Sequence, residues 1–192
     1  AEEKTGPMSE LGLSQETIDT AGTTLGVSGA NEAKRVQKEY MQNHRLNIPT
    51  LLMADIIHGF RTIFPIPLAL GSTWDEAAVE KMAEISAKEA AVSGLHVTFS
   101  PMVDLVRDPR WGRVMESTGE DPLLNSRLAA AMVRGYQGEN LKEDNWRVAA
   151  CVKHFAAYGG ALAGRDYNTV DMSPTPPPLP RQPPPPPHPP PP

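Results

Sequence analysis

The stretch Leu95-His96-Val97-Thr98-Phe99-Ser100-Pro101-Met102-Val103-Asp104 decides the fold class, because a short apolar run passes directly into a loop that carries charge. Three similar apolar runs occupy residues 23–27, 49–54 and 147–155. Near-continuous apolar runs of this length are typical of strands buried on both faces, which occur in parallel sheets. Parallel strands need crossover connections between them. The runs therefore predict an α/β protein.

Amphipathic segments of helical length separate the apolar runs. The apolar periodicity and the turn residues predict helices over about 31–45, 73–94 and 121–138. Thr73 and Glu76 have the spacing of a capping box, and Asp121-Pro122 reads as a cap followed by a proline in the first turn. The order of strand and helix along the chain fits either a doubly wound sheet or a barrel.

Polar side chains gather where the apolar runs end, and this favours the barrel. Asp55 follows the second run, the segment 104–113 follows the third, and Lys153-His154 lies in the fourth. Site residues at the carboxyl ends of several strands are typical of a (β/α)8 barrel, which needs about 250 residues. The 192-residue chain shows only four such units. The sequence predicts a partial (β/α)8 TIM-type barrel, about the first four βα units, over residues 1–173.

Composition excludes several function classes. Lys and Arg number 18 against 23 Asp and Glu, which gives a net charge of −5, the wrong sign for a nucleic-acid partner. No apolar stretch reaches the ~18–20 residues of a membrane span, and no export signal is visible, which leaves the compartment open. The single Cys151 lies in an apolar run, and we expect a buried, inert thiol there. His58 has no second histidine at metal spacing, so we expect no metal and a turn residue.

The last nineteen residues differ from the rest of the chain. Fourteen of the 21 prolines lie in 174–192, and such a segment is expected to be a disordered polyproline tail. A shifted reading frame over a C-rich stretch would produce it. A recognition tail is the alternative, because Pro177-Pro178-Leu179-Pro180-Arg181 resembles an SH3 or WW ligand.

Three groups of residues are candidates for binding chemistry. Asp55 is either a turn residue or a carboxylate that accepts hydrogen bonds from vicinal sugar hydroxyls. The segment 107–113 is either a solvated loop or the source of a guanidinium fork for a polyhydroxylated substrate, with Trp111 as a platform or as packing beneath the loop. Lys153 in an apolar run is costly unless it is paired or functional, and neighbouring strand residues such as Lys153 and His154 point to opposite faces.

These residues, taken in order, resemble the N-terminal barrel of family 3 glycoside hydrolases, most closely the bacterial β-glucosidase branch. The matching segments cover about residues 20–173 and are 53–59, 64–75, 99–122, 152–155 and 164–168. One such segment alone would be weak evidence for the resemblance, but the whole set in this order is specific to the family. The hexosaminidase branch is disfavoured, because the segment after Lys153-His154-Phe155 departs from its pattern.

The resemblance implies roles for five residues. The sugar in the −1 subsite would be bound by Asp55, Arg113, Lys153 and His154. Glu116 would hold the Arg113 side chain in place rather than bind the sugar itself. No residue of this chain is assigned as catalytic, because the family's nucleophile and acid/base follow in later segments. No cofactor is implied.

The implied function is that of a fragment of a retaining exo-acting β-glucosidase, with a β-glucoside or oligosaccharide as substrate and β-xylosidase specificity as a near alternative. The alternative belongs to another function class: a catalytically inactive carbohydrate-binding or interaction fragment that presents the proline-rich tail. Four strands leave two open sheet edges, so self-association through them is expected.

Overall fold

The computed structural model describes residues 14, 16, 20–27 and 29–171, so the proline-rich tail predicted for 174–192 lies outside the described residues. None of the described helices is long and apolar enough to cross a membrane. The main elements in chain order are β1 (Thr23–Leu25), α3 (Ala30–Asn43), β2 (Leu51–Ala54), α4 (Pro67–Gly71), α5 (Glu76–Val92), β3 (Val97–Thr98), α6 (Pro122–Gln137) and β4 (Ala149–Ala150). Three 3₁₀ turns, η1 (Val114–Glu116), η2 (Tyr158–Gly160) and η3 (Leu162–Gly164), lie in the loops.

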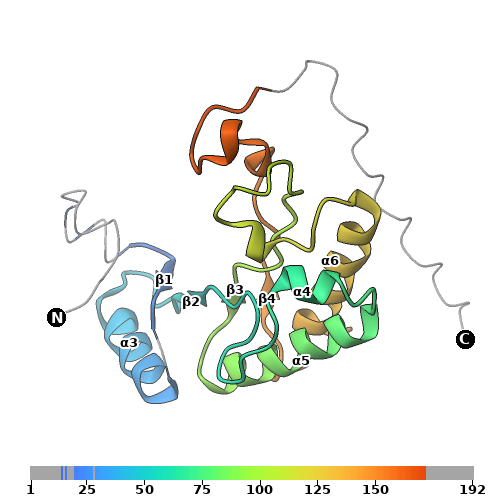
Figure 1. Cartoon of the computed structure of the whole chain (residues 1–192). Helices are drawn as coiled ribbons and strands as arrows, with labels where there is room; N and C mark the ends of the chain where they lie inside the picture. The colour runs from blue at the N-terminus through green and yellow to red at the C-terminus, as the bar shows by residue number, and fades with distance from the viewer. Residues whose placement is uncertain (1–13, 15, 17–19, 28, 172–192) are drawn as a thin grey trace, which may run out of the picture.

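The four strands form one parallel sheet in the order β1-β2-β3-β4, which confirms the predicted α/β class. Met53 pairs with Leu25 on one side and with Val97 on the other, and Val97 pairs with Ala149. The order follows the chain without the reversal that marks a doubly wound sheet. Figure 1 shows α3 beside β1 at one end of the sheet and the α5–α6 pair at the other end.

The core lies where α5 and α6 pack against each other and against the sheet. Its largest fully buried side chains include Leu52 of β2, Val79 of α5 and Leu128 of α6. Tyr136 of α6 is also fully buried, and its hydroxyl donates a 2.8 Å hydrogen bond to the carbonyl oxygen of Ile56. This bond fastens α6 to the loop that follows β2.

The helix boundaries match the predictions, with one correction at a cap. Asp121 caps α6, because its carboxylate accepts a 2.7 Å hydrogen bond from the amide of Leu124. The capping box predicted at Thr73 is wrong: Asp75 caps α5 and accepts a 3.0 Å bond from the amide of Ala78. Thr73 instead belongs to the preceding turn, where its hydroxyl donates to the carbonyl oxygen of Leu70.

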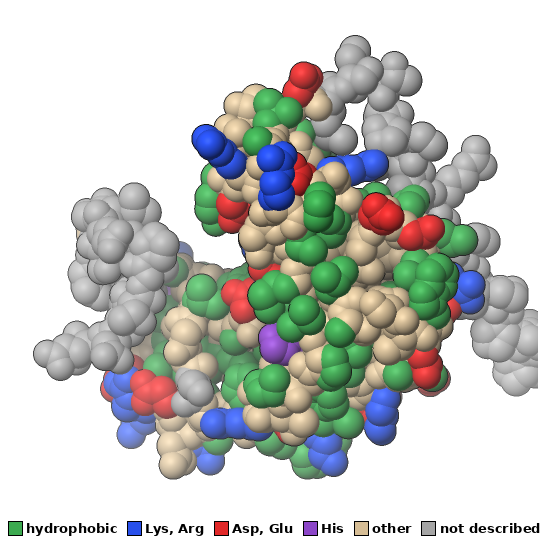
Figure 2. Space-filling model, in the orientation of Figure 1, with side chains coloured by type: hydrophobic (Ala, Val, Ile, Leu, Met, Phe, Trp, Pro, Cys, Tyr) green, Lys and Arg blue, Asp and Glu red, His purple; other side chains and the backbone are tan. Residues whose placement is uncertain are grey.

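The strands are shorter and more exposed than predicted. Leu25 and Leu51 are 50% and 47% exposed, and Cys151 is exposed, so the expected burial of its thiol is wrong. The reason is that β4 is the last strand of the described sheet, and Cys151 follows it along an uncovered edge. On the face drawn in Figure 2, hydrophobic side chains are spread over the middle, and most Lys and Arg side chains lie toward the lower and upper rims.

Candidate functional site

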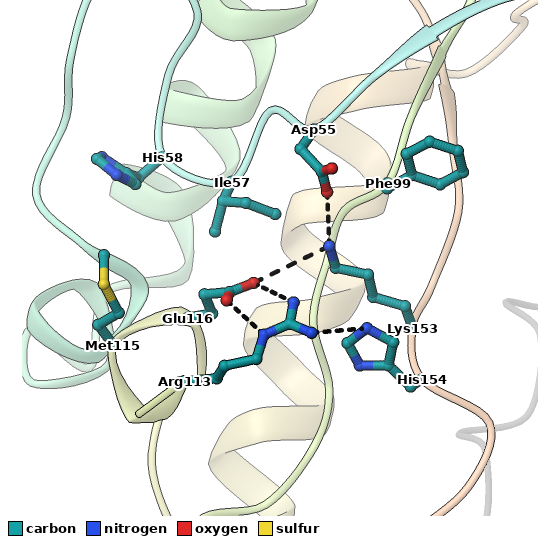
Figure 3. Close-up of a pocket in the computed structure, with 9 residues that line it drawn as sticks. All are labelled: Asp55, Ile57, His58, Phe99, Arg113, Met115, Glu116, Lys153 and His154. Carbon is teal, nitrogen blue, oxygen red and sulfur yellow. Dashed lines mark hydrogen bonds and ion pairs between the residues drawn. The ribbon is translucent and has the colours of Figure 1, made fainter. Parts of the chain in front are cut away.

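All five residues implied by the sequence lie around one pocket of about 600 Å³ (Figure 3). Asp55 directly follows β2, which ends at Ala54. After β3, Arg113 directly precedes the turn η1 and Glu116 ends it, while Lys153 and His154 follow β4. Since the strands are parallel, these segments emerge at the same edge of the sheet. The complete lining is Asp55, Ile57, His58, Phe99, Arg113, Met115, Glu116, Lys153 and His154.

Lys153 occupies the middle of the pocket. Its Nζ lies 2.6 Å from Oδ1 of Asp55 and 3.9 Å from Oε2 of Glu116. The Lys153 side chain is only 14% exposed, so two carboxylates compensate the cost of placing its charge there. The alternation of side chains along a strand predicts that Lys153 and His154 point to opposite faces, but both line the pocket. The alternation does not apply, because β4 ends at Ala150.

Arg113 is held by both oxygens of Glu116. Its Nε and one terminal nitrogen lie 2.6 Å and 2.7 Å from the two carboxylate oxygens, the bidentate geometry that fixes a guanidinium plane. These hydrogen bonds raise the pKa of Arg113, so the group is a permanent cation. Its other terminal nitrogen, Nη1, lies 3.3 Å from Nε2 of His154 (Figure 3).

Two residues without a predicted site role support this arrangement. Asp104 is buried, and its Oδ2 lies 2.7 Å from Nδ1 of His154. Tyr158 places its ring edge to face against His154 and under the Arg113 guanidinium, with its centroid 5.4 Å from Cζ of Arg113. Asp104 is the last residue of the segment 95–104, and a carboxylate at the end of an apolar run was the sequence signal that could have indicated its role. Tyr158 lies in a loop, where no periodicity indicates its position.

The three arginines of the loop 107–113 do not share one role. Arg110 pairs with Asp108 outside the pocket, and its hydrogen bonds lower the pKa of Asp108 to about 2. Trp111 is 2% exposed, and its Nε1 donates a 2.9 Å hydrogen bond to Asp166, so it packs beneath the loop and offers no platform. Of the loop's three arginines, only Arg113 lines the pocket.

His58 belongs to a turn and also borders the pocket. Its Nδ1 lies 3.0 Å from the carbonyl oxygen of Phe64, which closes the loop between β2 and α4. Within residues 20–27 and 29–171, no three His, Cys, Asp or Glu side chains are grouped so that they could hold a metal ion.

Comparison with known proteins identifies the family. The model of the glycosyl hydrolase family 3 N-terminal domain matches residues 18–176, most of the chain. The chain belongs to glycosyl hydrolase family 3. It is therefore a member of a glycoside hydrolase family, as the ordered motifs predicted.

Similar family 3 proteins include glucosidases and a xylosidase. A periplasmic β-glucosidase of Salmonella typhimurium is 46% identical over 152 residues, 79% of this chain and 20% of that protein. A β-xylosidase of Formosa agariphila is 34% identical over 83% of this chain and 24% of its own length. The crystal structure of a Listeria innocua β-glucosidase in complex with isofagomine has a TM-score of 0.84 at 59% identity, covering 88% of this chain and 24% of that one. The chain thus spans between a fifth and a quarter of these relatives.

Proposed function

We propose that this chain forms about the first four βα units of a (β/α)8 barrel in a retaining, exo-acting β-glucosidase and holds the terminal glucosyl residue in its −1 subsite. The strand order and the TM-score of 0.84 to a family 3 β-glucosidase support the barrel. Structures of that relative contain isofagomine or glucose, which supports a pyranose-sized ligand. The relatives that are 46% and 59% identical are both β-glucosidases, which favours glucose.

The observation that carries the proposal is the chain of opposite charges across the pocket. Asp55 pairs with Lys153, Lys153 approaches Glu116, and Glu116 holds Arg113. Asp55 is 56% exposed despite its ion pair, so its free lone pairs can accept hydrogen bonds from sugar hydroxyls. Lys153 and Arg113 donate only, which suits the hydroxyl oxygens. Alternating acceptors and donors on one pocket wall match a ring of vicinal hydroxyls.

The residues of this chain would bind and orient the sugar, while other segments carry out the chemistry. A retaining glycosidase uses two carboxyl groups about 5 Å apart, one as nucleophile and one as acid and then base. In our proposal both come from the family's later segments. Glu116 is occupied by two hydrogen bonds from Arg113, which suits it to hold the guanidinium. Fixing the sugar ring contributes to the rate through orientation.

The binding experiment measures the affinity of the whole 192-residue chain for glucose by NMR titration. We expect glucose to bind weakly, xylose to bind more weakly, and Asp55→Ala to reduce glucose affinity by about tenfold or more, because a charged hydrogen-bond partner is lost. Asp108→Ala is the matched control, since Asp108 pairs with Arg110 away from the pocket. Equal glucose binding by wild type and Asp55→Ala would overturn the proposal.

An activity assay separates the proposed role from a complete active site. We expect no hydrolysis of an aryl β-glucoside by the 192-residue chain above the uncatalysed rate, because the nucleophile and acid/base are assigned elsewhere. Turnover that disappears in Asp55→Ala would mean that the chain holds both catalytic carboxylates itself.

A further inference from the structure

Asp104 makes two contacts to one residue of the pocket. Its Oδ2 accepts a 3.0 Å hydrogen bond from the backbone N–H of His154 and lies 2.7 Å from the ring nitrogen Nδ1 of the same residue. The Asp104 side chain is only 3% exposed, and it does not line the pocket. A carboxylate at this depth needs hydrogen-bond donors, and His154 supplies both of the contacts described for it.

The neighbours of the imidazole require one proton arrangement. A carboxylate accepts and a guanidinium only donates. Asp104 at Nδ1 therefore requires a proton on that nitrogen, while Nη1 of Arg113, 3.3 Å from Nε2, requires a lone pair there. A doubly protonated ring would direct its Nε2–H against the N–H of Arg113. The remaining ring neighbour, Tyr158, stacks edge to face with centroids 4.7 Å apart.

We propose that Asp104 is a positioning residue that holds His154 as the neutral Nδ1–H tautomer, with the Nε2 lone pair directed at Arg113 and the pocket. Nε2 then acts as a hydrogen-bond acceptor in the site. When a polyol ligand displaces the Arg113 contact, one of its hydroxyls donates to Nε2. This last step rests on the proposed function, whereas the tautomer does not.

The backbone holds Asp104 and His154 together. The amide of Val103 donates a 2.8 Å hydrogen bond to the carbonyl oxygen of Lys153, so the two segments run side by side past the ends of β3 and β4. The hydroxyl of Ser117, which is buried, donates a 2.7 Å bond to the carbonyl oxygen of Asp104. The loop that carries Arg113 and Glu116 is thereby joined to the residue that orients His154.

His96 provides an internal reference with the opposite tautomer. The backbone N–H of Leu52 donates a 3.0 Å hydrogen bond to Nδ1 of His96, so this nitrogen carries a lone pair and the proton of the neutral ring lies on Nε2. Burial lowers the pKa of His96, which keeps the ring neutral at pH 7. The proposal therefore assigns opposite tautomers to His96 and His154.

The test is magic-angle-spinning NMR of the full chain labelled with ¹⁵N-histidine and sedimented, so that the measurement does not depend on oligomer size. Ring-nitrogen shifts distinguish a protonated nitrogen from one with a lone pair, and the signals that vanish in His154→Gln and in His96→Gln identify the two rings. We expect a proton on Nδ1 and none on Nε2 for His154, and the reverse for His96. A proton on Nε2 of His154, in a neutral or charged ring, would overturn the proposal.

Variants separate positioning from a merely structural role. In Asp104→Asn the amide oxygen can take the place of Oδ2 and keep both bonds, so we expect the Nδ1–H tautomer to persist. Asp104→Ala removes the acceptor 2.7 Å from Nδ1 and leaves only the longer, 3.3 Å Arg113 contact at Nε2, which is too weak to fix the ring by itself, so a mixture of tautomers should result. Asp108→Asn, four residues along the same loop, should change nothing. An unaltered Nδ1–H signal in Asp104→Ala, or a mixture in Asp104→Asn, would contradict the assignment.

Glucose affinity gives a second readout. We expect Asp104→Ala to weaken glucose binding by about tenfold and Asp104→Asn to restore most of it. If the tautomer responds as expected and glucose binding does not, the positioning role holds and the proposed sugar site fails. If both are unchanged, Asp104 does not orient His154.

Discussion

Nζ of Lys153 lies 2.6 Å from Oδ1 of Asp55, although the two residues are 98 positions apart in the chain. Asp55 follows β2 and Lys153 follows β4, and β3 lies between these two strands in the sheet. The long lysine side chain therefore spans the end of a strand to reach its partner. This explains how a lysine is accommodated after an apolar run: its ammonium group leaves the sheet and enters a pocket with two carboxylates.

Glu116→Gln tests the support of Arg113. The substitution removes the negative charge and one of two acceptors that fix the guanidinium, so Arg113 and Lys153 lose their common partner. We expect glucose affinity to fall by about tenfold, because the donors in the pocket are no longer held in place. The control is Glu120→Gln, an exposed neighbour. Titration of both variants by NMR decides the outcome, and equal affinities would show that Glu116 does not support the site.

Tyr136→Phe tests the bond that fastens α6 to the loop after β2. The change leaves the carbonyl oxygen of Ile56 without its buried donor, which costs about 1–3 kcal/mol in the free energy of unfolding. Urea unfolding at one fixed protein concentration measures it. Tyr167→Phe, at a hydroxyl-bearing ring that is 85% exposed, should change this free energy by less than about 0.5 kcal/mol.

The same tyrosine gives a pH dependence with a definite sign. Burial raises the pKa of Tyr136 to about 12, above the ordinary value of about 10. Between these values the unfolded chain loses the phenol proton and the folded chain keeps it, so the free energy of unfolding falls as the pH rises from about 10. Tyr136→Phe should make this fall less steep. Some slope remains, because desolvation also raises the pKa of Tyr158 to about 12. An unchanged slope in Tyr136→Phe would contradict the assignment.

Much of the fold followed from the sequence, because periodicity reports burial. The apolar runs and the Asp121-Pro122 cap predicted the parallel sheet and the start of α6 correctly. The errors came from features that periodicity does not encode. Thr73 and Asp75 are both good caps, and the path of the preceding turn chose between them. Cys151 follows an edge strand, and its exposure depends on what lies beside that edge.

For the site, the sequence indicated which residues matter but not their pairing. Asp55, Arg113 and Lys153 were indicated by the polar residues that follow the apolar runs and by the resemblance to family 3, and all three line one pocket. The link from Asp104 to His154 joins residues 50 positions apart and depends on the register of segments beyond the strands. Trp111 left two interpretations open, and its bond to Asp166 favours packing.

Gly135→Ala tests the close approach of α5 and α6. A Cβ atom at Gly135 would lie 2.3 Å from the carbonyl oxygen of Glu80 and 2.6 Å from Cβ of Ala83. Replacing glycine by alanine normally favours a helix by roughly 0.5–1 kcal/mol. Here we expect the opposite sign, a loss of about 1–3 kcal/mol from overpacking. Gly112→Ala, where the added atom meets nothing within 4 Å, is the control. A free energy of unfolding in urea that is higher for Gly135→Ala than for wild type would refute the close contact.

The last prediction concerns the open side of the described sheet. β1 and β4 each have one unpaired edge within residues 20–27 and 29–171. Large apolar side chains on or next to these two strands are exposed, among them Leu25 of β1 (50%) and, after β4, Val152 (53%) and Phe155 (106%). Each 100 Å² of such surface that another chain covers contributes about 2.5 kcal/mol. Because a whole domain is stable by only about 5–15 kcal/mol, this surface is large enough to control the behaviour of the chain.

We therefore expect the 192-residue chain on its own to self-associate through these edges. Size-exclusion chromatography with light scattering should give a mass above that of one chain, and Val152→Lys should lower it, because a lysine beside an edge opposes pairing. Leu123→Lys is the control, since Leu123 is 68% exposed but lies on α6. Near-UV circular dichroism of the three tryptophans reports the packing. A sharp monomer peak with a strong near-UV signal and cooperative melting would mean that the four units close their own core, and the partial-barrel interpretation would be wrong.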